Sequence, residues 1–381
     1  MKATVLKNGS LEFQEEADAP QPEAGEVLVR SLACGICGSD LHFVQHFEGF
    51  AETLVSGDGG AGITTDVEAS VVLGHEFAAE IVAYGPQCRE ELPLGARVTA
   101  VPIASRADAV ETIGFSPRFP GAYGEFFLLK EEALLEIPEG LGVDVASLTE
   151  PMAVGRHAVE EAHLEEGAVP WVVGCGPIGL AVIADLAARS ASLGIPAIVA
   201  SDPSPARRSL AEAMGATHVF DPNEESGQTQ WVPHLVRPEV AEPLFDFLPP
   251  TPALRQAVIF ECVGVPGVLD ALMEAAPPKT RLIVVGVCME PDSIRPALGV
   301  TKQLDLRFVL GYSPEEFRST LEDLAVGRLD PRPMLTGQVG VDGIGEAFDV
   351  LARPDEHAKI VVHPWRRGGV EPWSDPKGGE P

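Results

Sequence analysis

The chain has 381 residues, of which 45% are hydrophobic and 22% charged, and this favours a folded globular protein of two domains. Its 57 acidic side chains outnumber the 27 basic ones, giving a formal net charge of −30. Such a surface repels phosphate backbones and argues against nucleic acid as a main partner.

The sequence also argues against a membrane or a secreted location. No run of 18 apolar residues is present, so no membrane span is expected. The first residues, Met1 to Leu6, lack the apolar core of a signal peptide. Six scattered cysteines do not form a disulfide framework. We therefore expect a cytoplasmic protein.

Residues 1 to about 150 have the pattern of a β-rich domain. Short apolar runs between Gly and Pro turns predict strands at 26–30, 78–83 and 97–101. The segment 43–70 has no clear period, and we expect a long loop there. Its phenylalanines suit either a wall of a substrate pocket or ordinary packing: Phe43, Phe47 and Phe50.

From about residue 155 the pattern changes to alternating strands and helices. Strands are predicted at 171–173, 197–200, 258–262 and 281–285, and helices at 180–187 and 206–214. This alternation predicts a parallel sheet covered by helices. The Pro- and Glu-rich stretch 221–252, which contains Trp231, is expected to be an insertion at the edge of that domain.

The last part of the chain predicts a helix at 314–326 and a strand at 359–362. The tail from Arg366 is rich in Gly and Pro, and we expect it to be mobile. The runs 281–285 and 304–310 are expected to offer a sheet edge that pairs with a second copy of the chain.

A glycine-rich motif follows the strand at 171–173 and opens the next helix. The motif G-x-G-x-x-G and its helix start comprise Gly174, Gly176, Pro177, Ile178 and Gly179. In that context the glycines permit a tight turn, close approach of a pyrophosphate and close helix packing. Asp202, at the end of the following strand, is placed to accept hydrogen bonds from an adenosine ribose and favours NAD over NADP. Arg207, a few residues on, is a cation beside the same site and leaves NADP open.

Two short strings carry the side chains of a metal site. The string 35–42 contains Cys37, and the string 74–76 contains His75 and Glu76. A thiolate, an imidazole and a carboxylate suit a zinc ion that keeps a position open for substrate. Alternatives remain, because Cys34-x-x-Cys37 also fits a redox pair or half a zinc knuckle. His75-Glu76 also fits an ordinary strand end.

These strings, with the β-rich first part and the glycine motif, resemble the zinc-dependent alcohol dehydrogenases of the medium-chain dehydrogenase/reductase superfamily. The turn Gly95-Ala96-Arg97-Val98 is similar to a Gly-Asp-Arg-Val turn of that family, with Ala96 replacing Asp. The resemblance implies an α/β protein with a GroES-like catalytic domain (1–154 and 302–365), split around a Rossmann NAD-binding domain (155–301). Residues 366–381 remain as a flexible tail.

The resemblance also implies roles for individual residues. The zinc ligands would be Cys37, His75, Glu76 and Glu150, the last matching a Glu-Pro ligand of the polyol, glucose and threonine dehydrogenase branch. Glu150 also fits an acid placed for the dipole of a helix N-terminus. Asp40 would orient His75, as metal-bound imidazoles require. Ser39 and His42 would relay the substrate proton to solvent.

The function implied is hydride transfer between an alcohol and NAD, with a secondary alcohol, diol or polyol favoured. One departure from the family concerns a second, structural zinc, which four closely spaced cysteines hold in its classical members. No cysteine lies between Cys88 and Cys175, so we expect at most one zinc per chain. A homodimer or homotetramer is expected. Two alternatives are a zinc-free quinone or enone reductase and a non-catalytic nucleotide-binding protein.

Overall fold

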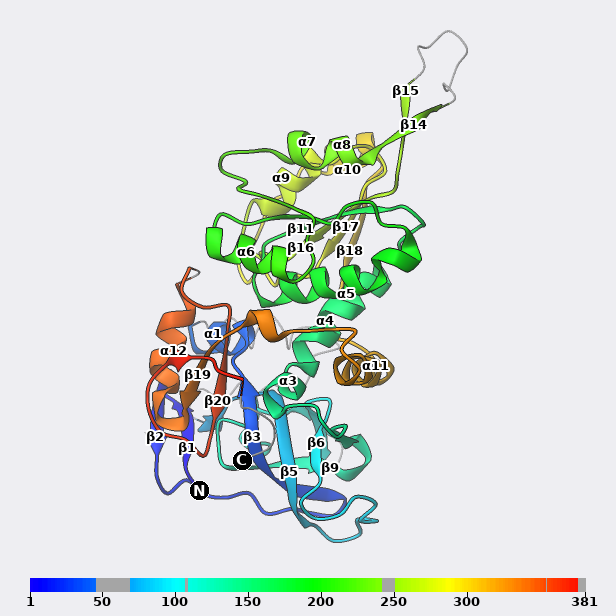
Figure 1. Ribbon diagram of the computed structural model, residues 1–381. Coiled ribbons are helices and arrows are strands. Elements are labelled where there is room, and N and C mark those ends of the chain that lie inside the picture. The colour runs from blue at the N-terminus through cyan, green and yellow to red at the C-terminus, as the bar shows by residue number, and fades with distance from the viewer. Residues whose placement is uncertain (46–68, 107–108, 242–250, 354, 376–381) are drawn as a thin grey trace. The chain divides into compact units, whose positions relative to one another are not determined.

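The computed structural model describes residues 1–45, 69–106, 109–241, 251–353 and 355–375, which divide into two compact units (Figure 1). Unit 1 comprises Met1–Glu150, Phe317–Arg328 and Leu335–Pro381, and unit 2 comprises Pro151–Glu316 and Leu329–Met334. The first unit is built mainly on strands and the second on alternating strands and helices. The predicted α/β fold with a β-rich part and a doubly wound part is confirmed. Among the described residues, no helix has the length and apolar character needed to cross a bilayer.

The core of unit 2 is a six-stranded parallel sheet with the order β13-β12-β11-β16-β17-β18. The strands are β11 (Val169–Val173), β12 (Val199–Ser201), β13 (His218–Phe220), β16 (Ala257–Glu261), β17 (Arg281–Val284) and β18 (Asp305–Phe308). In chain order this is 3-2-1-4-5-6, the order of a dinucleotide-binding sheet. The order reverses between β11 and β16, and ligands of such sheets bind at that reversal.

Helices lie on both sides of this sheet (Figure 1). On one side are α5 (Pro177–Leu193) and α6 (Pro205–Ala213), and on the other α9 (Val268–Ala275) and α10 (Pro296–Lys302). The unit begins with α4 (Thr149–Glu161), which starts two residues earlier, in unit 1. Because both faces are covered, β11 and β16 are buried along their whole length, as their largely apolar sequences indicate.

Unit 2 extends further along the chain than the predicted boundary at 301. Strand β18 adds to β17 in parallel, with Arg281 opposite Asp305, so residues 305–308 belong to the sheet and 302–316 to unit 2. This also corrects the predicted sheet edge, because β17 lies inside the sheet, whereas β18 lies at one of its two edges. Phe308 and Leu310, at the end of β18, are 70% and 78% exposed.

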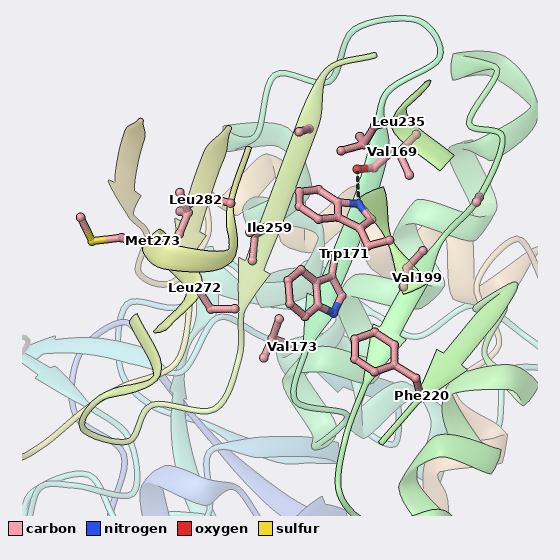
Figure 2. Close-up of a cluster of buried hydrophobic side chains, with 14 residues drawn as sticks. Val169, Trp171, Val173, Val199, Phe220, Leu235, Ile259, Leu272, Met273 and Leu282 are labelled. Atoms are coloured by element: carbon pink, nitrogen blue, oxygen red, sulfur yellow. Dashed lines mark hydrogen bonds between the residues drawn. The ribbon is translucent and has the colours of Figure 1, made fainter. Parts of the chain in front are cut away.

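The stretch 221–252 contributes to the core of unit 2 as well as to its surface. After α7 (Gly227–Gln230), Trp231 is fully buried, and its Nε1 donates to the carbonyl of Val169 at 3.1 Å. Its ring lies 5.4 Å from that of Trp171, which belongs to the buried hydrophobic cluster shown in Figure 2. Beyond α8 (Val232–Leu235), β14 (Val236–Ala241) and β15 (Thr251–Leu254) form a two-stranded ribbon that extends outward from the sheet (Figure 1).

Unit 1 is organised around one long strand. Strand β3 (Glu26–Gly35) pairs antiparallel with β5 (Glu76–Tyr84), β9 (Phe126–Lys130) and β20 (Lys359–His363) within an eight-stranded sheet. The remaining strands of that sheet are β6 (Arg97–Thr99), β10 (Leu135–Glu136), β19 (Leu335–Gly340) and β21 (Glu371–Pro372). A smaller sheet contains β1 (Ala3–Lys7), β2 (Ser10–Gln14) and β4 (Val71–Val72), and β7 (Ile103–Arg106) pairs with β8 (Ala109–Thr112).

The helices of unit 1 are short. They comprise α1 (Gly38–Gln45), α3 (Val143–Ser147), α11 (Pro314–Ala325), which begins in unit 2, and α12 (Ile344–Leu351). Single 3-10 turns lie at Glu131–Ala133, Arg332–Met334 and Val341–Gly343.

The described part of the predicted mobile tail is ordered. Strand β21 pairs with β19, and the indole Nε1 of Trp373 donates to the Asp144 carboxylate at 2.9 Å. The amide of Gly368 donates to Asp342 at 2.9 Å. The expected flexibility of 366–381 is therefore wrong for 366–375, because backbone pairing offsets the entropy cost that a Gly- and Pro-rich composition implies. Residues 376–381 lie outside the described part.

Candidate metal centre and cofactor loop

Strand pairing in unit 1 brings the two predicted metal strings together. Cys37 follows the end of β3, and His75 immediately precedes β5. In the β3–β5 register Gly35 lies opposite Glu76, and on the other side of β3 it lies opposite Val361 of β20. Side chains far apart in the sequence therefore meet at one end of β3.

Two glycines make room for this arrangement. A Cβ at Gly35 would lie 2.0 Å from Oε2 of Glu76, so only glycine leaves space for the carboxylate. Gly74 has φ +100°, and a Cβ there would lie 2.6 Å from the ring of Tyr123. Gly35 and Gly74 are thus required by the side chains that pack beside them.

The ligand atoms of Cys37, His75 and Glu76 all lie within 4.8 Å of one another. No other group of three or more such side chains was found among the described residues. His75 and Glu76 are 6% and 0% exposed, whereas Cys37 is partly exposed. A soft sulfur, an imidazole nitrogen and a carboxylate oxygen at this spacing fit a divalent metal such as zinc, with one side open.

The imidazole of His75 is oriented by Asp40. Its Nδ1 lies 3.3 Å from Oδ1 of Asp40, which leaves Nε2 for a metal. The other oxygen, Oδ2, accepts from the amide of Cys37 at 3.1 Å and from the hydroxyl of Tyr123 at 2.8 Å. Burial lowers the pKa of His75, but the Asp40 carboxylate and Cys37 raise it well above its ordinary value. Asp40 thus lies beside His75, and its role in orienting a metal-bound imidazole stays a prediction.

Lys359 is the residue that sequence reasoning missed. It is fully buried at the start of β20, and its Nζ lies 2.7 Å from each carboxylate oxygen of Glu76. Burial lowers the pKa of Lys359, but Glu76, then Cys37, and further Glu150, raise it above its ordinary value. The only sequence signal was a lysine opening an otherwise apolar strand.

The remaining predicted residues differ in how closely they approach the cluster. Ser39, in the first turn of α1, has its Oγ 3.4 Å from Nε2 of His75. His42 lies one turn later on the same helix and is partly buried. Glu150 lies in the first turn of α4 and is not part of the three-residue ligand group. Its role as a ligand stays a prediction.

Aromatic rings line one side of the cluster. The ring of Phe115 lies 5.1 Å from His75 and 5.1 Å from Phe43, which is fully buried. Phe43 therefore acts as a packing residue, one of the two roles that its sequence allowed. Phe47 and Phe50 lie outside the described residues.

In unit 2 the glycine motif forms the turn that its sequence predicted. Gly174 has φ +90°, in the left-handed region, and α5 begins at Pro177. A Cβ at Gly179 would lie 1.9 Å from the carbonyl oxygen of Gly174, so this residue must be glycine. No side chain of the described residues caps the N-terminus of α5, which leaves its first amides to an anion. Ile178 follows in the first turn, partly exposed.

Asp202 closes this loop. Its Oδ2 accepts from the amide of Cys175 at 2.8 Å, and its Oδ1 accepts from the amide of Ser204 at 2.8 Å. The buried carboxylate therefore ties the end of β12 to the glycine turn, a role that the sequence did not reveal. A guanidinium nitrogen of Arg207 lies 4.0 Å from where a Cβ of Gly176 would stand, so this cation borders the same loop.

Comparison with known proteins agrees with both halves of this arrangement. Residues 23–139 match the alcohol dehydrogenase GroES-like domain, and residues 177–326 match the zinc-binding dehydrogenase family. The chain is 30% identical to (R,R)-butanediol dehydrogenase of Bacillus subtilis, covering 96% of this chain and 100% of that protein. It is 26% identical to sorbitol dehydrogenase of the same organism, covering 96% of this chain and 98% of the relative.

A solved structure shows the same fold over nearly the whole length. The crystal structure of 2R,3R-butanediol dehydrogenase from Bacillus subtilis superimposes with a TM-score of 0.75 at 26% identity, covering 95% of this chain and 99% of that one. The resemblance inferred from the two metal strings and the glycine motif is thereby confirmed. The chain belongs to the zinc-type alcohol and polyol dehydrogenases of the medium-chain dehydrogenase/reductase superfamily.

Proposed function

We propose that this enzyme oxidises a secondary alcohol, diol or polyol to the ketone or aldehyde and transfers the hydride to NAD. The reaction consumes one alcohol and one NAD⁺ and releases one carbonyl product, one NADH and one proton. The observation that carries this proposal is the group of Cys37, His75 and Glu76 in a chain that also forms the glycine turn at 174–179. The relatives named for butanediol and sorbitol support the choice of substrate class.

One zinc ion per chain is proposed, held by Cys37, His75 and Glu76 with Glu150 as a fourth candidate. When bound, it would supply a Lewis acid that lowers the pKa of the substrate hydroxyl. Asp40 keeps Nε2 of His75 directed at that position. The absence of cysteines between Cys88 and Cys175 supports a single zinc.

The substrate proton would leave through two side chains of α1. The hydroxyl oxygen of Ser39, 3.4 Å from Nε2 of His75, borders the ligand group and would accept the proton from the alcohol. The imidazole of His42, one turn along the helix, would release it to solvent, since an imidazole can both accept and donate a proton. Ser39→Ala is therefore expected to lower turnover far more than it lowers the affinity for NAD.

NAD is the proposed hydride acceptor, held at the glycine turn, with its pyrophosphate at the N-terminus of α5. The carboxylate of Asp202 repels a 2′-phosphate, which supports NAD over NADP. Arg207 supports some use of NADP, since its guanidinium borders the loop. Asp202→Ala is expected to lower the preference for NAD, and the ratio of kcat/KM values for the two cofactors measures this.

We propose a homodimer or homotetramer in a reducing, cytoplasmic compartment. The exposed edge of β18, with Phe308 at 70% exposure, supports strand pairing between two copies. The six cysteines are all unpaired, which supports a reducing compartment.

The test is a panel of primary alcohols, secondary alcohols, vicinal diols and polyols with NAD and NADP, followed by NADH absorbance at 340 nm. Turnover fastest with vicinal diols or polyols and NAD supports the proposal. Turnover only with quinones or enones and NAD(P)H would support a zinc-free reductase on the same fold. Cofactor binding without turnover of any substrate would support a non-catalytic protein.

A further inference from the structure

Lys359 differs from a surface lysine in its burial and in its hydrogen bonds. Among the described residues it is the only lysine that is buried, and its three donors meet three acceptors. Two are the oxygens of Glu76, at 2.7 Å each, and the third is the carbonyl of Ile36 at 2.8 Å. An ammonium in this environment is fixed in place and remains charged beside its carboxylate.

The carboxylate that Lys359 holds is also one of the three candidate ligands. Glu76 lies within 4.8 Å of the ligand atoms of both Cys37 and His75. An oxygen that accepts from an ammonium has less electron density to give a metal, and the ammonium itself repels a divalent cation. The same lysine therefore affects the metal through Glu76 and directly through its own charge.

The charges around the proposed metal site show what the ammonium of Lys359 contributes. A thiolate at Cys37 and carboxylates at Asp40, Glu76 and Glu150 carry four negative charges, and a zinc ion carries two positive ones. His75 contributes none when neutral. The ammonium of Lys359 lowers the remaining charge from −2 to −1, which reduces the uncompensated charge that this buried group would otherwise hold.

We propose that Lys359 is a positioning residue that weakens Glu76 as a metal ligand and offsets part of the negative charge of the metal centre. The inference rests on the proposed function, because it presupposes a metal at Cys37 and His75. Glu76 thereby remains bound mainly to the lysine and leaves one metal position for the substrate. Without the ammonium, Glu76 becomes a full ligand and occupies that position.

A purely structural ion pair predicts the opposite effect on metal affinity. If Lys359 only joined β20 to β5 across β3, its loss would loosen the site and lower the affinity. If it weakens Glu76, then Lys359→Met raises the affinity, by about tenfold or more for a unit charge removed at this range. The direction of the change separates the two roles.

The experiment measures the affinity of the full-length protein for Zn²⁺ by competition with a chromophoric chelator, and the visible spectrum of the Co²⁺-substituted protein. Wild type is compared with Lys359→Met and Cys37→Ala. Lys130→Met is the matched control, since Lys130 pairs with the buried Glu26 at 3.1 Å at the other end of β3. We expect Lys359→Met to bind Zn²⁺ more tightly and to give a weaker Co²⁺ spectrum, as an added ligand produces. Lys130→Met should match wild type in both.

A second pair of variants keeps the test decisive if Lys359→Met does not fold. Glu76→Gln should weaken Zn²⁺ binding, and Glu76→Gln/Lys359→Met should recover part of that loss because the repelling charge is gone. Unchanged or weaker binding in Lys359→Met, or no recovery in the double variant, overturns the inference. If wild type binds no metal, or binds it equally with Cys37→Ala, the metal centre itself is overturned together with this inference.

Discussion

Unit 1 buries two glutamates at opposite ends of β3, and their surroundings differ in one respect. Glu26 accepts from Arg106 at 2.9 and 2.8 Å and from Lys130 at 3.1 Å, while Glu76 accepts from Lys359 at 2.7 Å. Both carboxylates are fully buried and paired with cations. Among the described residues, Glu76 belongs to a group with a thiol and an imidazole that could hold a metal, and Glu26 does not. Burial and ion pairing alone therefore do not identify a functional carboxylate.

The comparison implies that changes at one end of β3 should alter metal binding, and changes at the other end should alter stability. The largest effect is expected at His75, which supplies the nitrogen of the ligand group. His75→Ala should lower Zn²⁺ affinity by more than about 100-fold, and turnover by at least as much, because a ligand is lost outright. Metal analysis of the purified protein and kcat with a vicinal diol measure both.

A matched control is available in unit 2. His157 also has a carboxylate partner, with its Nδ1 3.0 Å from Oε1 of Glu316, but it lies outside the ligand group. His157→Ala should keep the full metal content. Equal loss of metal from the two variants would contradict the assignment of His75.

At the other end of β3, Glu26→Gln should reduce stability without removing metal. Breaking a buried pair costs about 3 kcal/mol of unfolding free energy, because Arg106 and Lys130 lose their counter-charge. Denaturant unfolding measures this cost. Glu80→Gln, which breaks the more exposed pair with Arg30 at 2.8 Å, should cost about 1 kcal/mol or less. A lower metal content in Glu26→Gln would contradict the expectation that Glu26 affects stability alone.

The lowered pKa of Glu26 predicts that the unfolding free energy depends on pH. Burial alone would raise the pKa of Glu26, but hydrogen bonds from Arg106, Glu23 and Lys130 lower it to about 2 from an ordinary value of 4.5. The unfolded chain takes up this proton first, so the stabilisation is full above pH 4.5 and is lost as pH falls towards 2. The difference in unfolding free energy between wild type and Glu26→Gln should shrink over that range. A constant difference would show that Glu26 is not the titrating group.

The smallest effect is expected at Tyr123, which acts on the metal only through Asp40. Tyr123→Phe removes the 2.8 Å hydrogen bond to Oδ2 and should weaken Zn²⁺ binding by about tenfold at most. Tyr84→Phe is the control, since that hydroxyl donates to the carbonyl of Leu92 at 2.7 Å, away from the cluster. Chelator competition measures the Zn²⁺ affinity of the two variants. Equal affinities would show that the Tyr123 hydroxyl does not help Asp40 to orient His75.

Much of the fold could be predicted from the sequence, because its signals are local. The glycine turn at 174–179 and the buried strands of unit 2 depend on backbone freedom and apolar runs, which short windows reveal. The short strings around Cys37 and His75 likewise allowed a metal site to be predicted from local sequence.

What the sequence did not reveal depends on long-range pairing. Lys359 lies 283 residues from Glu76, and only the β5–β3–β20 register brings them together. The tail at 366–375 has a composition typical of mobile segments, and its order comes from β19 and Asp144. The partner of a buried charge is set by topology, which composition does not encode.

The central claim is that one metal, held by Cys37 and His75, is required for alcohol oxidation with NAD. It is tested most directly by titrating the metal-free protein with Zn²⁺ while following NADH formation from a vicinal diol, with Cys37→Ala in parallel. The account predicts activity that rises in proportion to Zn²⁺, reaches its maximum at one equivalent per chain and stays at baseline in the variant. Full activity in the metal-free protein, or a maximum at two equivalents, would contradict it.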